Sequence, residues 1–215
     1  MNTEIIVVMD ESGSMAALRD DTIGSFNKFL ADQRAEPGEA RLTVVKFATG
    51  VKTLYRGVDL PKVPQMSRSQ YKPDGWTALY DGLGYALEVE GHRIFREQWA
   101  QGVIVFVVTD GEENYSKKFT GARIQEMVKH AEKHGWKFVY AAANVDAFTT
   151  GAAMGFARSM SVNTQNSSTG THAAYGAMSN VAKKYRSHGA SGQSVGSFSA
   201  DMTQELAETT AKVQP

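Results

Sequence analysis

Three oxygen-bearing side chains follow an apolar run near the start of the chain. Asp10, Ser12 and Ser14 occupy alternate positions directly after residues 5–9, and a helix-forming sequence comes next. We therefore expect a strand that ends in an oxygen-rich loop. Carboxylate and hydroxyl oxygens suit a hard cation such as Mg²⁺ or Mn²⁺, and Mg²⁺ keeps several of its waters when it binds a protein. This loop alone cannot complete the coordination shell, so other segments must contribute.

Two further positions can supply those oxygens. Thr77 lies in the stretch Asp-Gly-Trp-Thr-Ala-Leu-Tyr-Asp, and Asp110 follows the apolar residues 103–108. Both stand where a strand or a loop is expected to meet a helix. Taken alone, the first loop could simply be a helix N-cap, because Ser and Asp satisfy the free N–H groups of a helix start. Thr77 and Asp110 together favour a metal site.

The pattern of apolar residues predicts the elements that would position this site. Residues 5–9 and 103–108 are continuously apolar, which predicts parallel strands at 4–9 and 103–108 that helices cover on both faces. Residues 41–47 and 51–58 are joined by a short turn and predict an antiparallel hairpin at a sheet edge. The remaining pattern predicts strands at 136–143 and 158–162, and helices at 15–34, 77–90, 124–134, 147–155 and 172–185. The pattern leaves open whether the helix at 77–90 continues to residue 99.

This order of elements predicts an α/β fold with three layers, α/β/α. The sheet would be doubly wound, six-stranded and mostly parallel, with residues 51–58 as its one antiparallel edge strand. In such sheets ligands bind beyond the carboxyl ends of the strands, where the strand order changes direction. Asp10 and Asp110 lie at two such ends. If their strands are neighbours, the predicted ligands meet at that point.

Composition limits the class of protein. The chain has 215 residues, of which 42% are hydrophobic, which is enough for one domain, and we place it at residues 1–187. Residues 188–215 are rich in Gly and Ser and predict a flexible tail. Lys plus Arg and Asp plus Glu number 23 each, so we expect neither nucleic acid nor a membrane as partner. No secretory or membrane-spanning stretch is evident, which predicts a cytoplasmic protein.

Two other patterns have simpler explanations. His130 and His134 are four apart, as zinc ligands can be, but no Glu follows the first His directly. They also flank the apolar face of their helix, which favours solvated side chains. Residues 192–196 match Gly-x-Ser-x-Gly, yet that nucleophile needs a strand before it and a helix after it. Here it lies in the Gly/Ser-rich tail.

The metal motifs resemble those of the von Willebrand factor type A (VWA) domain with an intact metal-ion-dependent adhesion site (MIDAS). The family pattern Asp-x-Ser-x-Ser matches Asp10, Ser12 and Ser14, and its distant Thr and Asp match Thr77 and Asp110. The resemblance runs over residues 4–163. It implies that the Ser hydroxyls bind the metal directly, that Thr77 does so directly or through water, and that the two Asp act mostly through water.

Residues around the motif are candidates for contact with a partner. Family members often have Gly before the Thr, where this chain has Trp76, whose ring could shape a partner pocket or simply pack on the loop. Glu11, Glu112 and Glu113 add negative charge that would favour a cation, although acidic loop residues are common.

The resemblance implies a non-catalytic module that captures an acidic side chain of a partner protein through bound Mg²⁺ or Mn²⁺. One alternative is a metal-dependent phosphohydrolase that uses Asp10 as nucleophile. The related phosphatase pattern has a second acid two residues on, where this chain has Ser12, and no general acid or base is apparent. Another alternative is a structural or assembly subunit with an incidental metal site. The sequence does not identify the partner or the oligomeric state.

Overall fold

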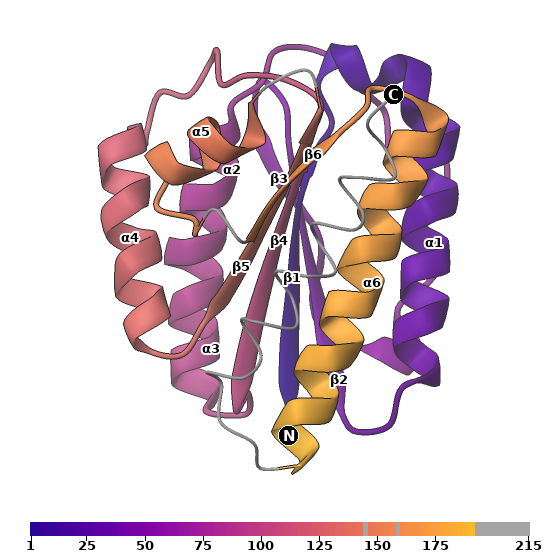
Figure 1. Ribbon diagram of the computed structural model, residues 1–215, viewed down its shortest axis with the longest axis vertical. Helices are drawn as coiled ribbons and strands as arrows, with labels where there is room; N and C mark the ends of the chain where they lie inside the picture. Colours follow the sequence, from indigo (N-terminus) through magenta and orange to yellow (C-terminus); the bar gives the residue numbers. More distant parts are fainter. Residues whose placement is uncertain (144–145, 158–159, 192–215) are drawn as a thin grey trace.

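A computed structural model of the chain describes residues 1–143, 146–157 and 160–191. Six strands form one sheet in the order β3-β2-β1-β4-β5-β6, with helices on both faces (Figure 1). The strands are β1 (Thr3–Asp10), β2 (Ala40–Phe47), β3 (Val51–Asp59), β4 (Gly102–Thr109), β5 (Lys137–Ala143) and β6 (Ser161–Thr164). Only β3 is antiparallel to its neighbour, which confirms the predicted fold class.

The two central strands, β1 and β4, are buried along their whole length. Successive side chains of a strand point to opposite faces, so continuous apolar residues fill two cores at once. Ile5 and Val7 of β1 belong to the core on one face, and Ile6 and Val8 belong to the core on the other. β1 pairs with β4 in parallel register, which places Asp10 and Asp110 at the same edge of the sheet.

Helices cover the two faces as separate layers (Figure 1). α1 (Arg19–Ala35) packs against α6 (Ser168–Ser191) on one face, where Phe29 meets Phe106 of β4 edge to face with ring centroids 6.0 Å apart. α2 (Leu79–Tyr85), α3 (Gly91–Glu97), α4 (Gly121–Lys133) and α5 (Ala147–Ala153) cover the other face. Burial of apolar side chains under these layers supplies the main stabilisation of the fold.

Several predicted boundaries were wrong. Residues 13–18 form a 3₁₀ helix, η1 (Gly13–Leu18), so α1 begins only at Arg19. The predicted helix 77–90 begins at Leu79 and passes through a π-helical segment, η3 (Ala86–Glu90), into α3. β6 is described from Ser161, and residues 158–159 of the predicted strand lie outside the described residues; α6 runs from Ser168 to Ser191, well beyond the predicted 172–185. Most of the predicted tail, residues 192–215, lies outside the described residues.

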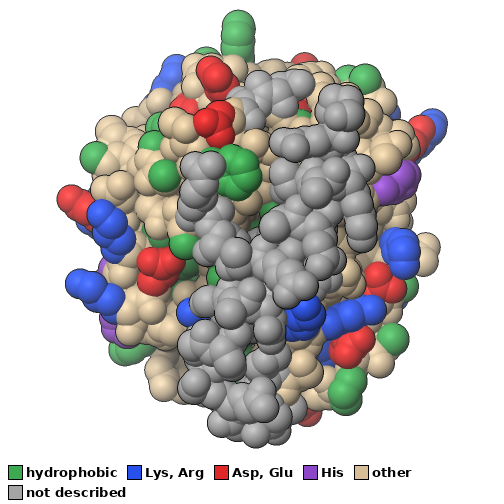
Figure 2. Space-filling view, viewed as in Figure 1, with side chains coloured by type: hydrophobic (Ala, Val, Ile, Leu, Met, Phe, Trp, Pro, Cys, Tyr) green, Lys and Arg blue, Asp and Glu red, His purple; other side chains and the backbone are tan. Residues whose placement is uncertain are grey.

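The outer surface carries charges of both signs in mixture. Figure 2 shows Lys and Arg side chains interspersed with Asp and Glu on the face it displays. This agrees with equal numbers of acidic and basic residues. Among the helices that the structure describes, none is long and apolar enough to cross a membrane.

A buried ionic cluster ties the start of β1 to the helices on the second face. Arg93 of α3 pairs with Glu4 at 2.6 Å and with Glu90 of η3 at 2.9 Å, and both glutamates are at most 1% exposed. Thr43 of β2 donates to the same Glu4 at 2.8 Å. Burial raises the pKa of Glu4, opposed by the neighbouring Arg93 cation and the Thr43 hydroxyl. Because buried charges are costly without partners, this cluster depends on Arg93.

Arg93→Ala should destabilise the protein strongly, by about 3–5 kcal/mol in the free energy of unfolding, because it leaves the buried Glu4 carboxylate without a cation, whereas Glu90 keeps its pair with Arg56 at 2.9 Å. Urea denaturation measures this change. The control is Arg123→Ala, which removes an exposed pair with Glu126 at 3.1 Å and should cost no more than about 1 kcal/mol. If both variants lost the same free energy of unfolding, the buried cluster would not be important for stability.

Candidate metal site

The loop after β1 is held by hydrogen bonds from three directions. Ser12 N–H donates to Asp10 Oδ1 at 2.7 Å, and the Thr109 hydroxyl donates to Asp10 Oδ2 at 2.5 Å. The Tyr71 hydroxyl donates to the backbone carbonyl of Asp10 at 2.6 Å. Asp10 is fully buried. Its carboxylate is therefore fixed in one orientation, at the point where the chain leaves the sheet.

Asp110, at the end of the neighbouring strand, meets the same loop. The Ser14 hydroxyl donates to Asp110 Oδ1 at 2.6 Å, and Ser12 Oγ lies 3.1 Å from Ser14 Oγ. Asp110 Oδ2 is buried and has no hydrogen-bond partner within the described part of the chain. A buried carboxylate oxygen without a partner is costly unless a cation or water satisfies it. This oxygen therefore has room for a cation or a water as its partner.

Thr77 reaches this place from a third loop. A methyl group placed on Gly111 would lie 3.7 Å from Thr77 Oγ1 and 3.9 Å from Ser14 Oγ, so both hydroxyls border the same small space. The structure thus brings together all five predicted ligands, which come from three separate loops. Thr77 is 4% exposed and Ser12 is 1% exposed, whereas Ser14 is exposed to solvent.

The loop that carries Thr77 is braced from both sides. Gly75 adopts φ +80°, a conformation that favours glycine, and a Cβ there would lie 2.3 Å from Thr49 Oγ1. Its carbonyl accepts a hydrogen bond from Gly13 N–H at 3.0 Å, which ties this loop to the one after β1. On the other side, Asn114 exchanges two hydrogen bonds with the backbone of Thr77, at 2.9 and 3.0 Å.

Acidic residues beyond the motif hold the loop after β4 against α2. Glu113 accepts hydrogen bonds from Tyr80 N–H at 2.9 Å and from Ser116 N–H at 2.6 Å. Asp81 accepts from the backbone N–H groups of residues 117–119 at 2.9–3.0 Å. The motifs in the sequence did not predict these roles, nor those of Thr109, Tyr71 and Asn114. For all of them except Tyr71, the abundance of short polar residues in segments 74–81 and 109–120 is the signal that could have indicated a role.

The predicted partner-contact residues differ in their surroundings. Glu11 is paired with Lys46 at 2.6 Å and accepts Lys72 N–H at 2.6 Å, so its charge is largely compensated inside the protein. Glu112 is exposed. Trp76 is 60% exposed, and its ring stacks on Tyr115 with centroids 6.3 Å apart and planes at 8°. The structure therefore leaves Glu112 and Trp76 accessible to a partner.

The negative charges of Asp10 and Asp110 are not balanced by basic side chains of the described residues. Burial raises the pKa of Asp10 to about 6, partly opposed by hydrogen bonds from Thr109 and Ser12, and the nearby Asp110 raises it further. Burial also raises the pKa of Asp110, opposed by Ser14. Neither carboxylate forms an ion pair with a basic side chain of the described chain. A bound cation would relieve both costs.

The donor set fits a hard divalent cation. Two carboxylates and three hydroxyls offer only oxygen, the ligand that Mg²⁺ and Mn²⁺ prefer. Among described residues, no three His, Cys, Asp or Glu side chains cluster as metal ligands. Any ion here would accordingly depend on the hydroxyls of Ser12, Ser14 and Thr77. The unpartnered Asp110 oxygen supports the same fit.

A doubly wound sheet with Asp10, Ser12 and Ser14 after its first strand defines a protein of the VWA class. The sequence matches the family model for the von Willebrand factor type A domain over residues 4–175, so this chain belongs to the VWA family. No curated protein matches the sequence.

Three solved structures share the fold at low sequence identity. Proximal thread matrix protein 1 from the mussel byssus, described with a zinc-occupied MIDAS motif, is 19% identical with a TM-score of 0.60. The alignment covers 85% of this chain and 46% of that one. The PilB minor pilin of Streptococcus sanguinis is 15% identical with a TM-score of 0.58, covering 85% and 61% of the two chains.

The manganese-loaded TRAP protein of Plasmodium vivax is 18% identical with a TM-score of 0.51, covering 71% of this chain and 61% of that one. In each case the match spans less than two thirds of the other protein. These similarities support the fold.

Asp10→Asn should stabilise the metal-free protein at neutral and higher pH. A pKa raised from 3.8 to about 6 means that the ionised carboxylate costs the folded state about 3 kcal/mol. Stability that is present below pH 3.8 is lost as the pH rises through about 6. Asparagine keeps the acceptor for Ser12 N–H and does not ionise, so the variant should not show this loss.

Urea denaturation of both proteins in chelator, from pH 4 to pH 8, measures the difference. As the pH rises, the free energy of unfolding of the variant should increase relative to that of wild type, by up to about 3 kcal/mol. Asp74→Asn, on an exposed residue of a nearby loop, is the control and should show no such gain. A constant difference between Asp10→Asn and wild type over this range would contradict the assignment.

Proposed function

We propose that this VWA domain is a non-catalytic, metal-dependent protein-binding module. Ser12, Ser14 and Thr77 would hold Mg²⁺ or Mn²⁺, with Asp10 and Asp110 acting mostly through water. The bound ion would supply an electrophilic position for an acidic side chain of a partner protein. The observation that carries the proposal is the buried, unpartnered Asp110 Oδ2 beside three hydroxyls from separate loops.

Charge balance explains why such a site would capture a carboxylate. Hydroxyl ligands are neutral, so an ion that is bound to them directly keeps much of its positive charge toward an incoming acid. Ser14 and Glu112 are exposed, so the site opens toward solvent on this side. In support, proximal thread matrix protein 1 has a structure with a zinc-occupied MIDAS motif, and the TRAP protein has one loaded with manganese.

The geometry disfavours the phosphohydrolase alternative. Asp10 is fully buried, and both of its carboxylate oxygens accept hydrogen bonds, from Ser12 N–H and from the Thr109 hydroxyl. A nucleophilic carboxylate needs an accessible oxygen. The other alternative, a structural or assembly subunit with an incidental metal, predicts partner binding that a chelator does not change.

A cytoplasmic location is part of our proposal and is tested by cell fractionation.

Ser14→Ala should weaken Mg²⁺ and Mn²⁺ binding strongly while leaving the fold intact, because it removes a ligand on an exposed residue and no core volume. Titration calorimetry with each metal measures the affinity, and circular dichroism checks the fold. Ser69→Ala, which removes another exposed hydroxyl, is the matched control. Equal metal affinity in Ser14→Ala and wild type would remove the basis of the proposal.

Trp76→Ala should weaken capture of a partner without changing metal affinity, because the exposed ring lies next to Thr77 and coordinates nothing. A pull-down with and without chelator, followed by calorimetry with Mn²⁺, separates the two effects. Phe95→Ala is the control, since Phe95 is 75% exposed and lies on α3 at the other end of the sheet. Undiminished capture by Trp76→Ala would indicate that the ring only packs on Tyr115.

A further inference from the structure

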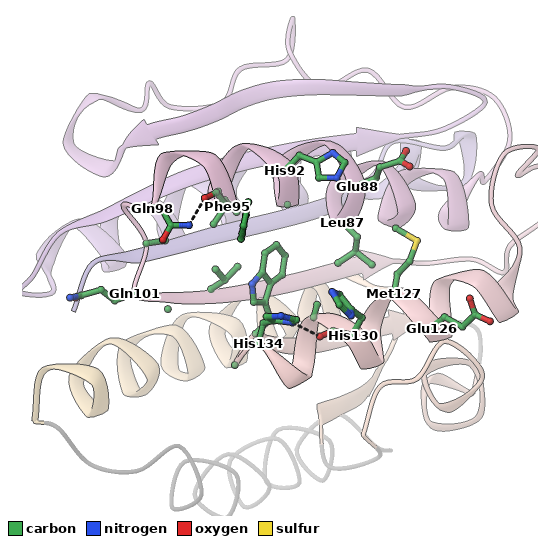
Figure 3. A pocket seen from close by; sticks show the side chains of 18 of the residues that line it. Leu87, Glu88, His92, Phe95, Gln98, Gln101, Glu126, Met127, His130 and His134 are labelled. Atoms are coloured by element: carbon green, nitrogen blue, oxygen red, sulfur yellow. Dashed lines mark hydrogen bonds between the residues drawn. The ribbon is translucent and has the colours of Figure 1, made fainter.

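A second group of potential metal ligands lies at the opposite end of the sheet. His130 of α4 and His134, the residue that follows the helix, have ring centroids 4.6 Å apart and ring planes tilted by 49°. Both side chains are exposed. Figure 3 shows the two rings next to each other on one side of the helix. Both side chains are solvated, as the sequence predicts, and their rings also contact each other.

One hydrogen bond prepares His134 to act as a ligand. Its Nδ1 lies 2.9 Å from the backbone carbonyl oxygen of His130. A carbonyl oxygen only accepts, so Nδ1 must carry the proton and the neutral ring has its lone pair on Nε2. Histidines that bind metals are commonly oriented by such a bond from the other ring nitrogen. The backbone therefore selects the tautomer that metal binding requires.

The end of α4 keeps this arrangement in place. His134 N–H donates to Ala131 O at 2.9 Å, and Gly135 follows with φ +84°. A positive φ directly after a helix favours glycine and ends the helix at a defined residue. The position of His134 relative to the last helical turn is thus set by the chain itself.

The neighbouring charges leave the two rings available. Within the described residues, the His130 ring has no hydrogen-bond partner. Glu126, one turn before His130, is paired with Arg123 at 3.1 Å. No acidic side chain of the described residues pairs with either ring.

The pair also lies on the wall of a cavity. A cavity of about 880 Å³ lies between α3 and α4, and its lining includes Leu87, Met127 and Trp136 as well as both histidines (Figure 3). An ion held by only two protein ligands keeps coordination positions open. Here those positions are accessible to water or to a small ligand in the cavity.

We propose that His130 and His134 chelate a borderline transition-metal ion such as Zn²⁺ through their imidazole nitrogens. Imidazole suits Zn²⁺, Ni²⁺ and Cu²⁺, whereas Mg²⁺ and Mn²⁺ prefer the oxygen ligands at the other end of the sheet. The two sites therefore differ in chemistry as well as in position. This proposal does not depend on the function proposed for Asp10 and its neighbours.

Calorimetric titration with Zn²⁺ tests the pair in the full chain that carries Ser14→Ala, so that the oxygen site contributes little heat. Adding His130→Ala should lower the Zn²⁺ affinity on the order of 100-fold, because the second imidazole then loses its intramolecular partner. His130→Ala removes no side-chain hydrogen bond, so the fold should be unchanged. His92→Ala, an exposed histidine on the same cavity, is the matched control and should keep the affinity.

Nitrogen-15 NMR of the histidine rings identifies the coordinating atoms. Zn²⁺ should shift the resonance of His134 Nε2 and one ring nitrogen of His130, and leave those of His92 and His172 unchanged. Equal Zn²⁺ affinity with and without His130→Ala would overturn the proposal. So would Zn²⁺-induced shifts confined to other histidines.

Discussion

Two buried carboxylates, Asp10 and Asp110, lie at the ends of adjacent central strands without a basic side chain of the described residues as partner, and hydrogen bonds from the surrounding loops hold them there. Each is buried, and each has a pKa that burial raises. The parallel pairing of β1 with β4 makes this proximity unavoidable, since both strands end at the same edge of the sheet. The hydrogen bonds from Ser12, Ser14 and Thr109 offset part of the cost and orient the oxygens.

The loops around these carboxylates are fastened to one another by hydrogen bonds. Asn114 joins the loop after β4 to Thr77, and Gly75 joins the Thr77 loop to the loop after β1. Each of the three loops is therefore positioned by the other two. Such mutual bracing is how a site built on loops can reach the accuracy that metal ligation needs. It also means that a residue such as Asn114 can affect the site without touching a ligand atom.

The two ends of the molecule offer different chemistry. The carboxyl end of the sheet gathers hydroxyls and carboxylates, while the other end has a cavity of mixed lining with imidazoles on its wall. Trp76 at one end and Phe95 at the other are both exposed aromatic side chains. At the start of β1, the buried cluster of Glu4, Glu90 and Arg93 fixes α3 against the sheet.

The sequence alone determined the fold class and predicted which five oxygen-bearing residues meet at one end of the sheet, because long apolar runs and short polar motifs are local patterns. It could not determine the 3₁₀ turn at Gly13–Leu18 or the π-helical segment before α3, because packing against other elements decides the exact winding of a helix. The bracing by Glu113, Asn114 and Asp81 was equally hidden, since these residues find their partners more than 30 positions away. For His130 and His134, spacing was visible in the sequence, but the tautomer depends on a hydrogen bond that only the folded end of α4 provides.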